Sequence, residues 1–429
     1  MNEYKKIELV AKGKTKEVWK TNIADMVIWN YLSKITVNDD SGKPKEFKSK
    51  AKYITSTKAR VFELLEKAGI PTSYIGQFSE TEIVAKNCKM IPLEVAVHRF
   101  ALGNYLKYHP EFKEPENNLP HRFHSLCLDL FLKTTNGSLL IDEKKIISEL
   151  SIEDDDTIIV NPESLEWTLL YPNSFDTASP ENTDRKTILP EHVEMKLIDE
   201  LSRKAFLVLE GAWNSIGYRL IDCRLEFGIT EDCKLVIAEV IDNDSWGLCT
   251  DDWQEMSNYV FCERYPIAEV EDKYERVAQL VSQFRIPEQT IVLWRGSESD
   301  KLPDIPNLAG LNIETPVISG HKKTVLVTKE LERLHTLYPE GGVIIALVGM
   351  SNGLGPILSA RTNWQVISVC TTAKEFPEDV WSTLRMPSNV PNATMLDDKN
   401  AVLCALNILG QKNPAIYAYR RLAIEKLDI

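Results

Sequence analysis

Apolar residues recur along this chain at spacings that predict three helices. The clearest case is 58–68, where the apolar positions fall on one helical face and where Gly69, followed by Pro71, is typical of a helix end. The same spacing predicts helices at about 191–215 and 267–284. These segments provide the helical part of the expected fold.

Short continuous apolar runs in the last third of the chain predict buried strands, and each leads into a polar or glycine-bearing loop. This pattern is typical of an α/β parallel sheet covered by helices, in which ligands bind beyond the carboxyl ends of the strands. The runs are 291–294, 343–348 and 366–369. The stretch 285–288 resembles a connector, so we expect domains at 1–285 and 289–429.

Residues 219–242 predict a β-hairpin, since two runs with a two-residue period flank the polar stretch 230–233. Alternation in the first run leaves Arg224 and Glu226 on the face opposite the apolar side chains. If the turn is centred between residues 232 and 233, Glu226 opposes Glu239 with Cβ atoms about 5 Å apart. Two carboxylates at that separation repel, so either a Mg²⁺ ion or Arg224 is the expected compensation. A solvated acidic sheet face has the same pattern.

The region 112–190 is acidic, rich in Pro and Asn, and weakly patterned, which predicts long surface excursions. Between 301 and 318, Pro303 and Pro306 predict that any crossover helix is short or broken.

Charge and composition narrow the function classes. The 429 residues carry a net charge of −13 without a concentrated basic stretch, which argues against nucleic acid and against an anionic membrane surface as partners. No apolar run approaches the roughly 18 residues of a spanning helix, and no apolar signal segment follows the first six residues. The eight cysteines are scattered, as expected for reduced thiols. We therefore expect a cytoplasmic protein.

Near the N-terminus, 12–16 (KGKTK) places three lysines around a glycine, which suits nucleotide phosphates but also an exposed basic strand. It is not a Walker A loop. Read together with the acidic hairpin, it favours phosphoryl transfer from ATP, because that chemistry consists mainly of positioning and charge neutralisation.

Three loops of the last third carry candidate chemistry: 296–300, 319–322 and 349–356. Glycines in the first and third let backbone N–H groups approach an anion, and His321 in the second is a candidate proton carrier. A helix N-cap for the first loop and a structural role for His321 are the alternatives.

At these residues the chain resembles the animal-type bifunctional phosphoribosylaminoimidazole carboxylase and succinocarboxamide (SAICAR) synthetase family, over almost its whole length. In the first part the resemblance rests on 13–18 (GKTKEV), 90–94 (MIPLE), 225–228 (LEFG) and 240–246 (VIDNDSW). In the second part it rests on 296–300 (GSESD), 319–322 (SGHK), 351–356 (SNGLGP) and 379–382 (DVWS).

The resemblance implies an α+β ATP-binding synthetase domain followed by a three-layer, flavodoxin-like carboxylase domain. The second domain would carboxylate aminoimidazole ribonucleotide with CO₂, without ATP or biotin, and His321 would move the ring proton. The implied substrate-binding residues are Ser297, Asp300, Lys322, Ser351, Asn352 and Gly353.

In the first domain the resemblance implies that ATP activates the new carboxylate and that the amine of aspartate then attacks it. Lys14, Lys16 and Glu94 match ATP-binding positions, while Glu226 and Glu239 match Mg²⁺ ligands. The family also implies a homo-octamer assembled through its carboxylase domains.

Several positions depart from the family pattern. Two positions where arginine is usual are His98 and Gly247; Asn104, Thr134 and Thr135 are further departures in the first part, and Gly320 and Met350 in the second. Two function classes follow: a working bifunctional enzyme, or a diverged paralogue with weakened synthetase activity that acts as a non-catalytic subunit or binding protein.

Overall fold

The computed structural model describes most of the chain, and the account below concerns those residues. They are 4–13, 16–35, 45–46, 49–103, 105–113, 119–133, 139–141, 144–147, 157–159, 162–170, 181–189, 193–239, 241–257, 267–349 and 351–427. The chain folds into two compact units, Met1–Phe284 with Glu425–Ile429, and Arg285–Ile424.

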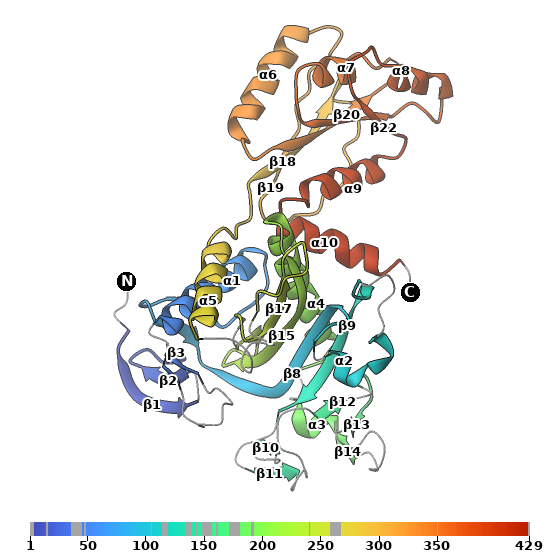
Figure 1. Ribbon diagram of the computed structural model, residues 1–429. Helices are drawn as coiled ribbons and strands as arrows, with labels where there is room; N and C mark the ends of the chain where they lie inside the picture. Colours follow the sequence, from blue (N-terminus) through green and yellow to red (C-terminus); the bar gives the residue numbers. More distant parts are fainter. Residues whose placement is uncertain are drawn as a thin grey trace. The chain divides into compact units, whose positions relative to one another are not determined.

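The first unit begins with an antiparallel five-stranded sheet in the order β1-β2-β3-β7-β6 (Figure 1). Its strands are β1 (Lys6–Lys12), β2 (Lys16–Thr21), β3 (Met26–Tyr31), β6 (Tyr74–Gln77) and β7 (Glu82–Lys86). Helix α1 (Lys50–Lys67) packs on β3, β6 and β7 and also contacts α5 (Ile267–Val281). The predicted helix at 58–68 is confirmed, although it begins earlier, and Gly69 follows it with a φ of +76°.

The second sheet of this unit has eight strands and is built around the long strand β8 (Figure 1). Its order is β14 (Glu181–Asp184), β13 (Glu166–Leu170), β12 (Thr157–Ile159), β9 (Arg122–Leu132), β8 (Cys88–Phe100), β15 (Arg219–Thr230) and β16 (Leu235–Ile237), with β17 (Trp246–Cys249) also paired to β15. Helix α4 (Met195–Ser215) packs on β8 and β15, which confirms the second predicted helix.

Smaller elements complete the first unit. They are α2 (Tyr105–Tyr108), the 3₁₀ helix η1 (Pro110–Phe112), α3 (Arg185–Ile188), and the two-stranded pairs β4 (Lys34–Ile35) with β5 (Lys45–Glu46) and β10 (Leu139–Ile141) with β11 (Lys144–Ile147).

The prediction that 112–190 consists of surface excursions is wrong for part of this region. Strand β9 lies between β8 and β12 inside the sheet, and Trp167 on β13 is fully buried. The acidic, Pro-rich composition of the whole window concealed a local alternation, because every second residue from Leu126 to Leu132 is leucine.

The predicted hairpin forms, but its register differs by one residue from the expected one. Strands β15 and β16 are antiparallel and pair Phe227 with Ile237 and Ile229 with Leu235. Five residues therefore lie between the paired Ile229 and Leu235, and the Ala238 amide donates to the Glu226 carbonyl at 3.1 Å. Glu226 does not oppose Glu239; across the sheet it opposes Glu94 of β8.

The second unit is a five-stranded, wholly parallel sheet in the order β19-β18-β20-β21-β22 (Figure 1). Its strands are β18 (Gln289–Arg295), β19 (Leu311–Glu314), β20 (Gly342–Val348), β21 (Gln365–Cys370) and β22 (Ala393–Met395). The three predicted strands are thereby confirmed. Residues 301–308 between β18 and β19 contain no helix, as the two prolines indicated.

Helices cover both faces of this parallel sheet. Its helices are α6 (Thr324–Leu337), α7 (Leu354–Ser359), α8 (Trp381–Leu384), α9 (Asp398–Leu409) and α10 (Pro414–Glu425), with the 3₁₀ helix η4 (Pro377–Val380). Alternate strand residues form two cores: one packs against α6 and α7, the other against α9 and the start of α10. The predicted three-layer α/β class is confirmed.

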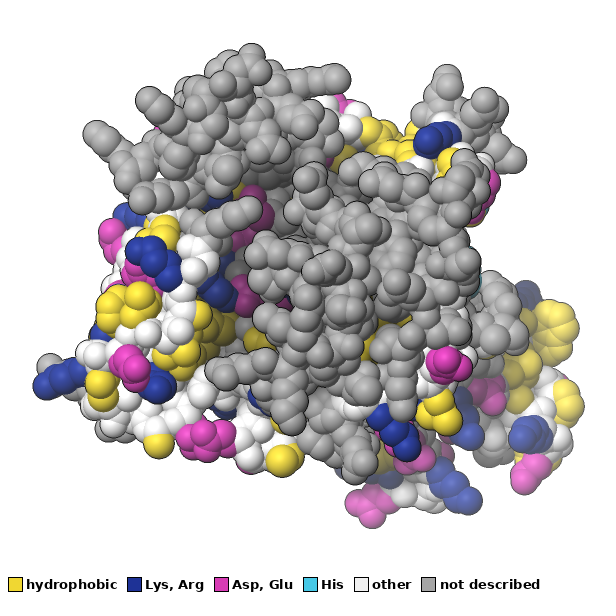
Figure 2. Space-filling model, turned by 90° about the horizontal axis from the view of Figure 1, so that it is seen from below, with side chains coloured by type: hydrophobic (Ala, Val, Ile, Leu, Met, Phe, Trp, Pro, Cys, Tyr) yellow, Lys and Arg dark blue, Asp and Glu magenta, His cyan; other side chains and the backbone are white. Residues whose placement is uncertain are grey.

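Acidic and basic side chains are interspersed on the described surface shown in Figure 2. This mixture agrees with a chain that has 63 acidic and 50 basic residues but no concentrated basic stretch. Within the described ranges, no helix combines the length and the apolar character needed to cross a bilayer.

Candidate functional sites

Four carboxylates of the first unit converge where β8, β15 and the loop after β16 meet. Glu94 and Glu226 face each other across the β8–β15 ladder, and Glu239 and Asp242 follow β16. Each of the four is paired with a different basic side chain, from β2, α1, β15 or the end of β9. The pairs are Glu94 with Arg224, Glu226 with Lys133, Glu239 with Lys16, and Asp242 with Lys58.

A cation does offset the negative charge of Glu226, but it is Lys133 and not the expected Arg224. Arg224 bonds to Glu94 at 2.7 Å, whereas Lys133 donates to Glu226, also at 2.7 Å. Burial, followed by repulsion from Glu239, raises the pKa of Glu226 to about 7 even though Lys133 acts in the opposite direction. A carboxyl group with this pKa can take up or release a proton near neutral pH.

Glu239 behaves differently although it is half-buried beside the same charges. Burial acts to raise its pKa, but the ammonium group of Lys16, which bonds to both carboxylate oxygens, holds the pKa of Glu239 below its usual range. Two neighbouring carboxyls thus have pKa values pushed apart, a feature frequent at functional sites.

Lys16 lies on β2 and pairs with Glu239, with its Nζ 4.9 Å from the ring centroid of Trp29. Lys14 lies outside the described residues, as do Asn104, Thr134, Thr135 and Met350.

A resident metal ion does not fit these carboxylates. Among the described residues, no group of three or more His, Cys, Asp or Glu side chains could hold one. The oxygens of Glu226 and Glu239 already accept from Lys133 and Lys16. The assignment of Glu226 and Glu239 as Mg²⁺ ligands therefore stays a prediction.

The two positions where the resembled family has arginine, 98 and 247, both lie beside one buried side chain, Asp222 of β15. In the two strand ladders Asp222 pairs with His98 on β8 and with Gly247 on β17. The Gly247 amide donates to Asp222 Oδ1 at 2.7 Å, and a Cβ at Gly247 would approach that oxygen to 2.8 Å. His98 lies between Asp222 and Asp129, with nitrogen–oxygen distances of 3.8 and 3.4 Å. The two departures are therefore spatially linked.

Sequence reasoning missed Lys133, Lys58, Asp242 and Asp222. Lys58 carried a usable signal, since it lies on the apolar stripe of α1 with Ile54, four residues before it, and Val61, three after. A lysine on the buried face of a helix needs a partner. Lys133 and Asp222 had no comparable signal, because only the strand pairing brings them to Glu226 and His98.

In the second unit, the three predicted loops meet at one edge of the parallel sheet. At the end of β18, Arg295 forms a parallel bridge with Val317, and the Ile318 amide donates to the Arg295 carbonyl at 3.0 Å. A Cβ on Gly353 would meet His321 Nε2 at 2.4 Å, and a Cβ on Gly320 would meet Leu354 Cα at 2.8 Å. The His321 loop and the glycine loop are therefore in direct contact, which only glycine permits at these positions.

The first loop of this unit is held by its own polar groups. The Ser297 amide donates to Asp300 Oδ2 at 3.1 Å, and the hydroxyls of Ser297 and Ser299 lie 2.9 Å apart. Residues 296–299 and Lys322 are exposed and Asp300 is half-buried, so this loop remains accessible to a ligand.

Asn352 is held by hydrogen bonds within the second unit, and its predicted substrate-binding role stays a prediction. Its side chain is buried, donates to Ser368 Oγ at 2.9 Å and accepts from the Gly355 amide at 2.7 Å. The backbone N–H of Asn352 donates to Ser382 Oγ at 3.0 Å. We therefore interpret Asn352 as a residue that shapes the glycine loop. Ser382, from the 379–382 stretch, supports the same loop.

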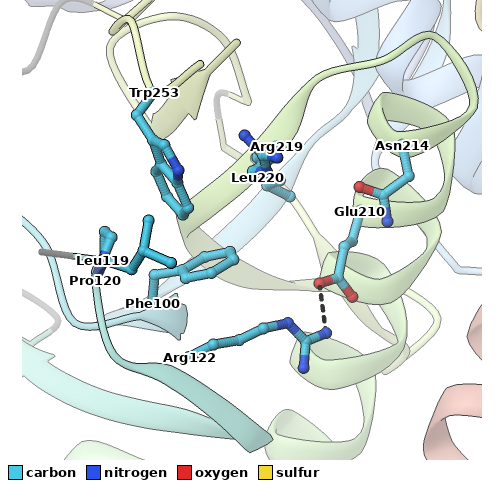
Figure 3. Close-up of a pocket in the computed structure, with 9 residues that line it drawn as sticks. All are labelled: Phe100, Leu119, Pro120, Arg122, Glu210, Asn214, Arg219, Leu220 and Trp253. Atoms are coloured by element: carbon cyan, nitrogen blue, oxygen red, sulfur yellow. Dashed lines mark ion pairs between the residues drawn. The ribbon is translucent and has the colours of Figure 1, made fainter. Parts of the chain in front are cut away.

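A separate cavity of about 340 Å³ lies in the first unit, at the opposite ends of β8 and β15 from the carboxylates. Phe100 and Trp253 form its aromatic wall, and Arg122 reaches Glu210 of α4 across its floor at 4.0 Å (Figure 3). Glu94 and Phe100 are six residues apart on β8, or roughly 20 Å at the usual strand rise. The described lining contains none of the predicted site residues.

Each of the two units matches the model of a known protein family. The family model for SAICAR synthetase matches residues 9–164 and 176–278, and the model for AIR carboxylase matches residues 276–425. A Caenorhabditis elegans protein named probable multifunctional protein ADE2 is 29% identical over 430 residues, covering 96% of this chain and 92% of that protein.

Two further proteins are similar to this chain, one over nearly its whole length and one over its first part. The Drosophila melanogaster bifunctional phosphoribosylaminoimidazole carboxylase/phosphoribosylaminoimidazole succinocarboxamide synthetase is 29% identical over 439 residues, covering 97% of this chain and 92% of that protein. A solved SAICAR synthetase (Type-2) in complex with ADP is 20% identical with a TM-score of 0.47, covering 65% of this chain and 99% of its own.

Proposed function

Because the chain belongs to the SAICAR synthetase family and continues into an AIR carboxylase domain, we propose that it catalyses two consecutive steps of purine biosynthesis. The second unit adds CO₂ to aminoimidazole ribonucleotide (AIR), which gives the carboxylated nucleotide CAIR. The first unit then joins CAIR to aspartate with ATP. The observation that carries the proposal is the match of both families, one after the other, along a single chain.

For the carboxylation, the contact between His321 and Gly353 supports a proton-transfer role for the histidine. The ring carbon of AIR attacks CO₂ and forms the new C–C bond, and the proton on that carbon then leaves to His321 as the aromatic ring is restored. Ser297, Asp300 and Lys322 would bind the phosphate and ribose. Ser351 and backbone groups of the glycine loop would hold the new carboxylate. No ATP or biotin takes part in this step.

For the ligation, a carboxylate oxygen of CAIR attacks the γ-phosphorus of ATP, and ADP leaves. The amine of aspartate then attacks the acyl phosphate, the amide bond forms, and inorganic phosphate and a proton are released. Lys16 supplies positive charge for the phosphates, Lys14 is proposed to do the same, and Glu94 faces the nucleotide. Arg224 holds Glu94 in place through the 2.7 Å bond.

The test is aspartate- and ATP-dependent conversion of CAIR by the purified full-length protein, followed by product absorbance, with Glu226→Ala as control. Turnover that is lost in the control supports a working synthetase. A folded protein without turnover would instead support the diverged-paralogue alternative, in which His98 and Gly247 leave too little positive charge for an anionic substrate.

The carboxylase half is tested separately with AIR and bicarbonate. His321→Ala is expected to abolish CAIR formation while the synthetase rate is unchanged. Carboxylation at the wild-type rate would remove His321 from the mechanism. We further propose a homo-octamer, which sedimentation of the full chain would reveal.

A further inference from the structure

Among the described residues, five carboxylates of the synthetase site each lie beside a lysine or arginine side chain. Besides the four pairs described above, Lys50 lies 3.4 Å from Asp244, which also accepts from the Tyr274 hydroxyl at 2.6 Å. Five carboxylates and five cations thus form one array around the region where ATP is proposed to bind. Lys58 is the member of this array that differs most from a surface ion pair.

Lys58 is enclosed within the unit. Its side chain is 3% exposed and that of Asp242 is 2% exposed. The ammonium nitrogen lies 3.3 Å from Asp242 Oδ2 and 3.8 Å from the ring centroid of Tyr31. At this depth water cannot solvate either charge, so each depends on the other. The aromatic face adds a second favourable contact for the cation.

Lys58 acts on more than one carboxylate. Its charge also stabilises the ionised form of Glu239, to which Lys16 is bonded directly. Lys16 and Lys58 together bring two positive charges to Glu239 and Asp242, which is the charge of one divalent cation. Burial keeps Lys58 in this place, because a buried ammonium cannot move into solvent without separating from its partner.

We propose that Lys58 is a built-in counter-ion of the nucleotide site, in the role that a resident divalent cation would have beside Glu239 and Asp242. The inference rests on the proposed function only in that this site binds a nucleotide. It concerns the protein before nucleotide arrives, since Mg²⁺ commonly enters together with substrate phosphates. Two consequences follow: the free protein has low affinity for divalent metal, and it binds nucleotide phosphates without metal.

The first measurement uses Mn²⁺ alone, detected by electron paramagnetic resonance, with the full-length protein. The wild type is expected to bind Mn²⁺ no more tightly than about 1 mM, and Lys58→Met at least ~10-fold more tightly, because Asp242 and Glu239 then lack a buried cation. The matched control is Lys52→Met on the same helix, since Lys52 pairs with Glu80 at the exposed surface. Lys52→Met should behave as the wild type.

The second measurement is ADP binding by calorimetry, in EDTA and in Mn²⁺. Wild-type affinity should be the same in both within about threefold, whereas Lys58→Met should lose at least ~10-fold in EDTA and regain it in Mn²⁺. Tight Mn²⁺ binding by the wild type would overturn the proposal, and so would a folded Lys58→Met that matches the wild type in both assays.

The two experiments separate the inference from the function on which it rests. If Lys58→Met does not fold, the wild-type Mn²⁺ titration still decides, because micromolar binding contradicts a built-in counter-ion. If the wild type binds no ADP under any condition, the proposed nucleotide site fails, whereas the Mn²⁺ result continues to test Lys58.

Discussion

At the scale of single residues, burial and neighbouring charge decide which carboxyl groups of the synthetase site are ionised. Glu226 and Glu239 have the same chemistry, but the first has a raised pKa and the second a lowered one. The difference arises because Lys16 reaches both oxygens of Glu239, whereas Lys133 bonds one oxygen of Glu226. The residue type alone therefore does not determine whether these two glutamates are ionised.

The raised pKa of Glu226 predicts a pH dependence of stability. The folded protein holds this proton more tightly than the unfolded chain does, so folding is favoured at low pH. As pH rises from the ordinary value of 4.5 towards about 7, the free energy of unfolding falls, by at most about 3 kcal/mol. Glu226→Gln should remove this decrease. Urea unfolding at a series of pH values measures the difference, and parallel curves for both proteins would contradict the assignment.

A second prediction concerns Gly353, whose backbone allows alanine because its φ is −86°. The added Cβ would nevertheless meet the His321 ring at 2.4 Å and displace it. Gly353→Ala should lower the carboxylation rate at least ~10-fold without affecting the synthetase rate. Gly349→Ala is the matched control in the same loop, because its Cβ meets nothing nearer than 3.8 Å. Equal losses in both variants would show that the His321 contact is not the cause.

At the scale of elements, a buried arginine joins strands β8 and β9 to helix α4. Arg99 is fully buried and donates to both oxygens of Glu210 at 2.7 and 3.0 Å. The same guanidinium donates to the carbonyls of Phe123 and His124 on β9. This contact fixes the helix against the sheet that carries Glu94 and Glu226.

Arg99→Met is therefore expected to lower the free energy of unfolding of the first unit by about 3–5 kcal/mol, because the buried carboxylate of Glu210 then loses both hydrogen bonds from Arg99 and keeps only the longer 4.0 Å contact with Arg122. Arg60→Met provides the comparison, since Arg60 pairs with Glu63 on the surface of α1 and should contribute less than about 1 kcal/mol. Chemical denaturation measures both. Equal losses of unfolding free energy in the two variants would mean that the buried Arg99–Glu210 pair stabilises the unit no more than a surface pair does.

At the scale of the whole molecule, the chain combines two units whose proposed active residues do not overlap. His321 and its loops belong to one unit, and Lys16 with its carboxylates belongs to the other. CAIR, the product of the second unit, is the substrate of the first. Each activity should therefore survive inactivation of the other.

This organisation predicts complementation. His321→Ala should lose carboxylation and Lys16→Met should lose ligation, while a mixture of the two proteins should convert AIR, bicarbonate, aspartate and ATP to SAICAR. Product analysis with each variant alone provides the controls. A mixture that remains inactive, although each variant retains its own single activity, would show that CAIR does not pass through solution.

The sequence by itself determined the fold class, the three helices, the parallel strands and the loops that bear His321. These depend on local periodicity and on glycines beside strands, and such signals survive in a single sequence because neighbouring residues create them. Strand β9 was not predicted, because the acidic, Pro-rich composition around it masked a short apolar alternation.

Only the tertiary structure decided which charges meet. The hairpin register is one residue away from the expected one, so Glu226 does not oppose Glu239. The pairing of β15 with β8 and β17 placed Glu226 opposite Glu94, and His98 and Gly247 on either side of Asp222. Lys58 reaches Asp242 from a helix 184 positions earlier in the chain. Ion pairs of this kind join residues that are distant in sequence, and their energies depend on burial, so no local pattern can specify them.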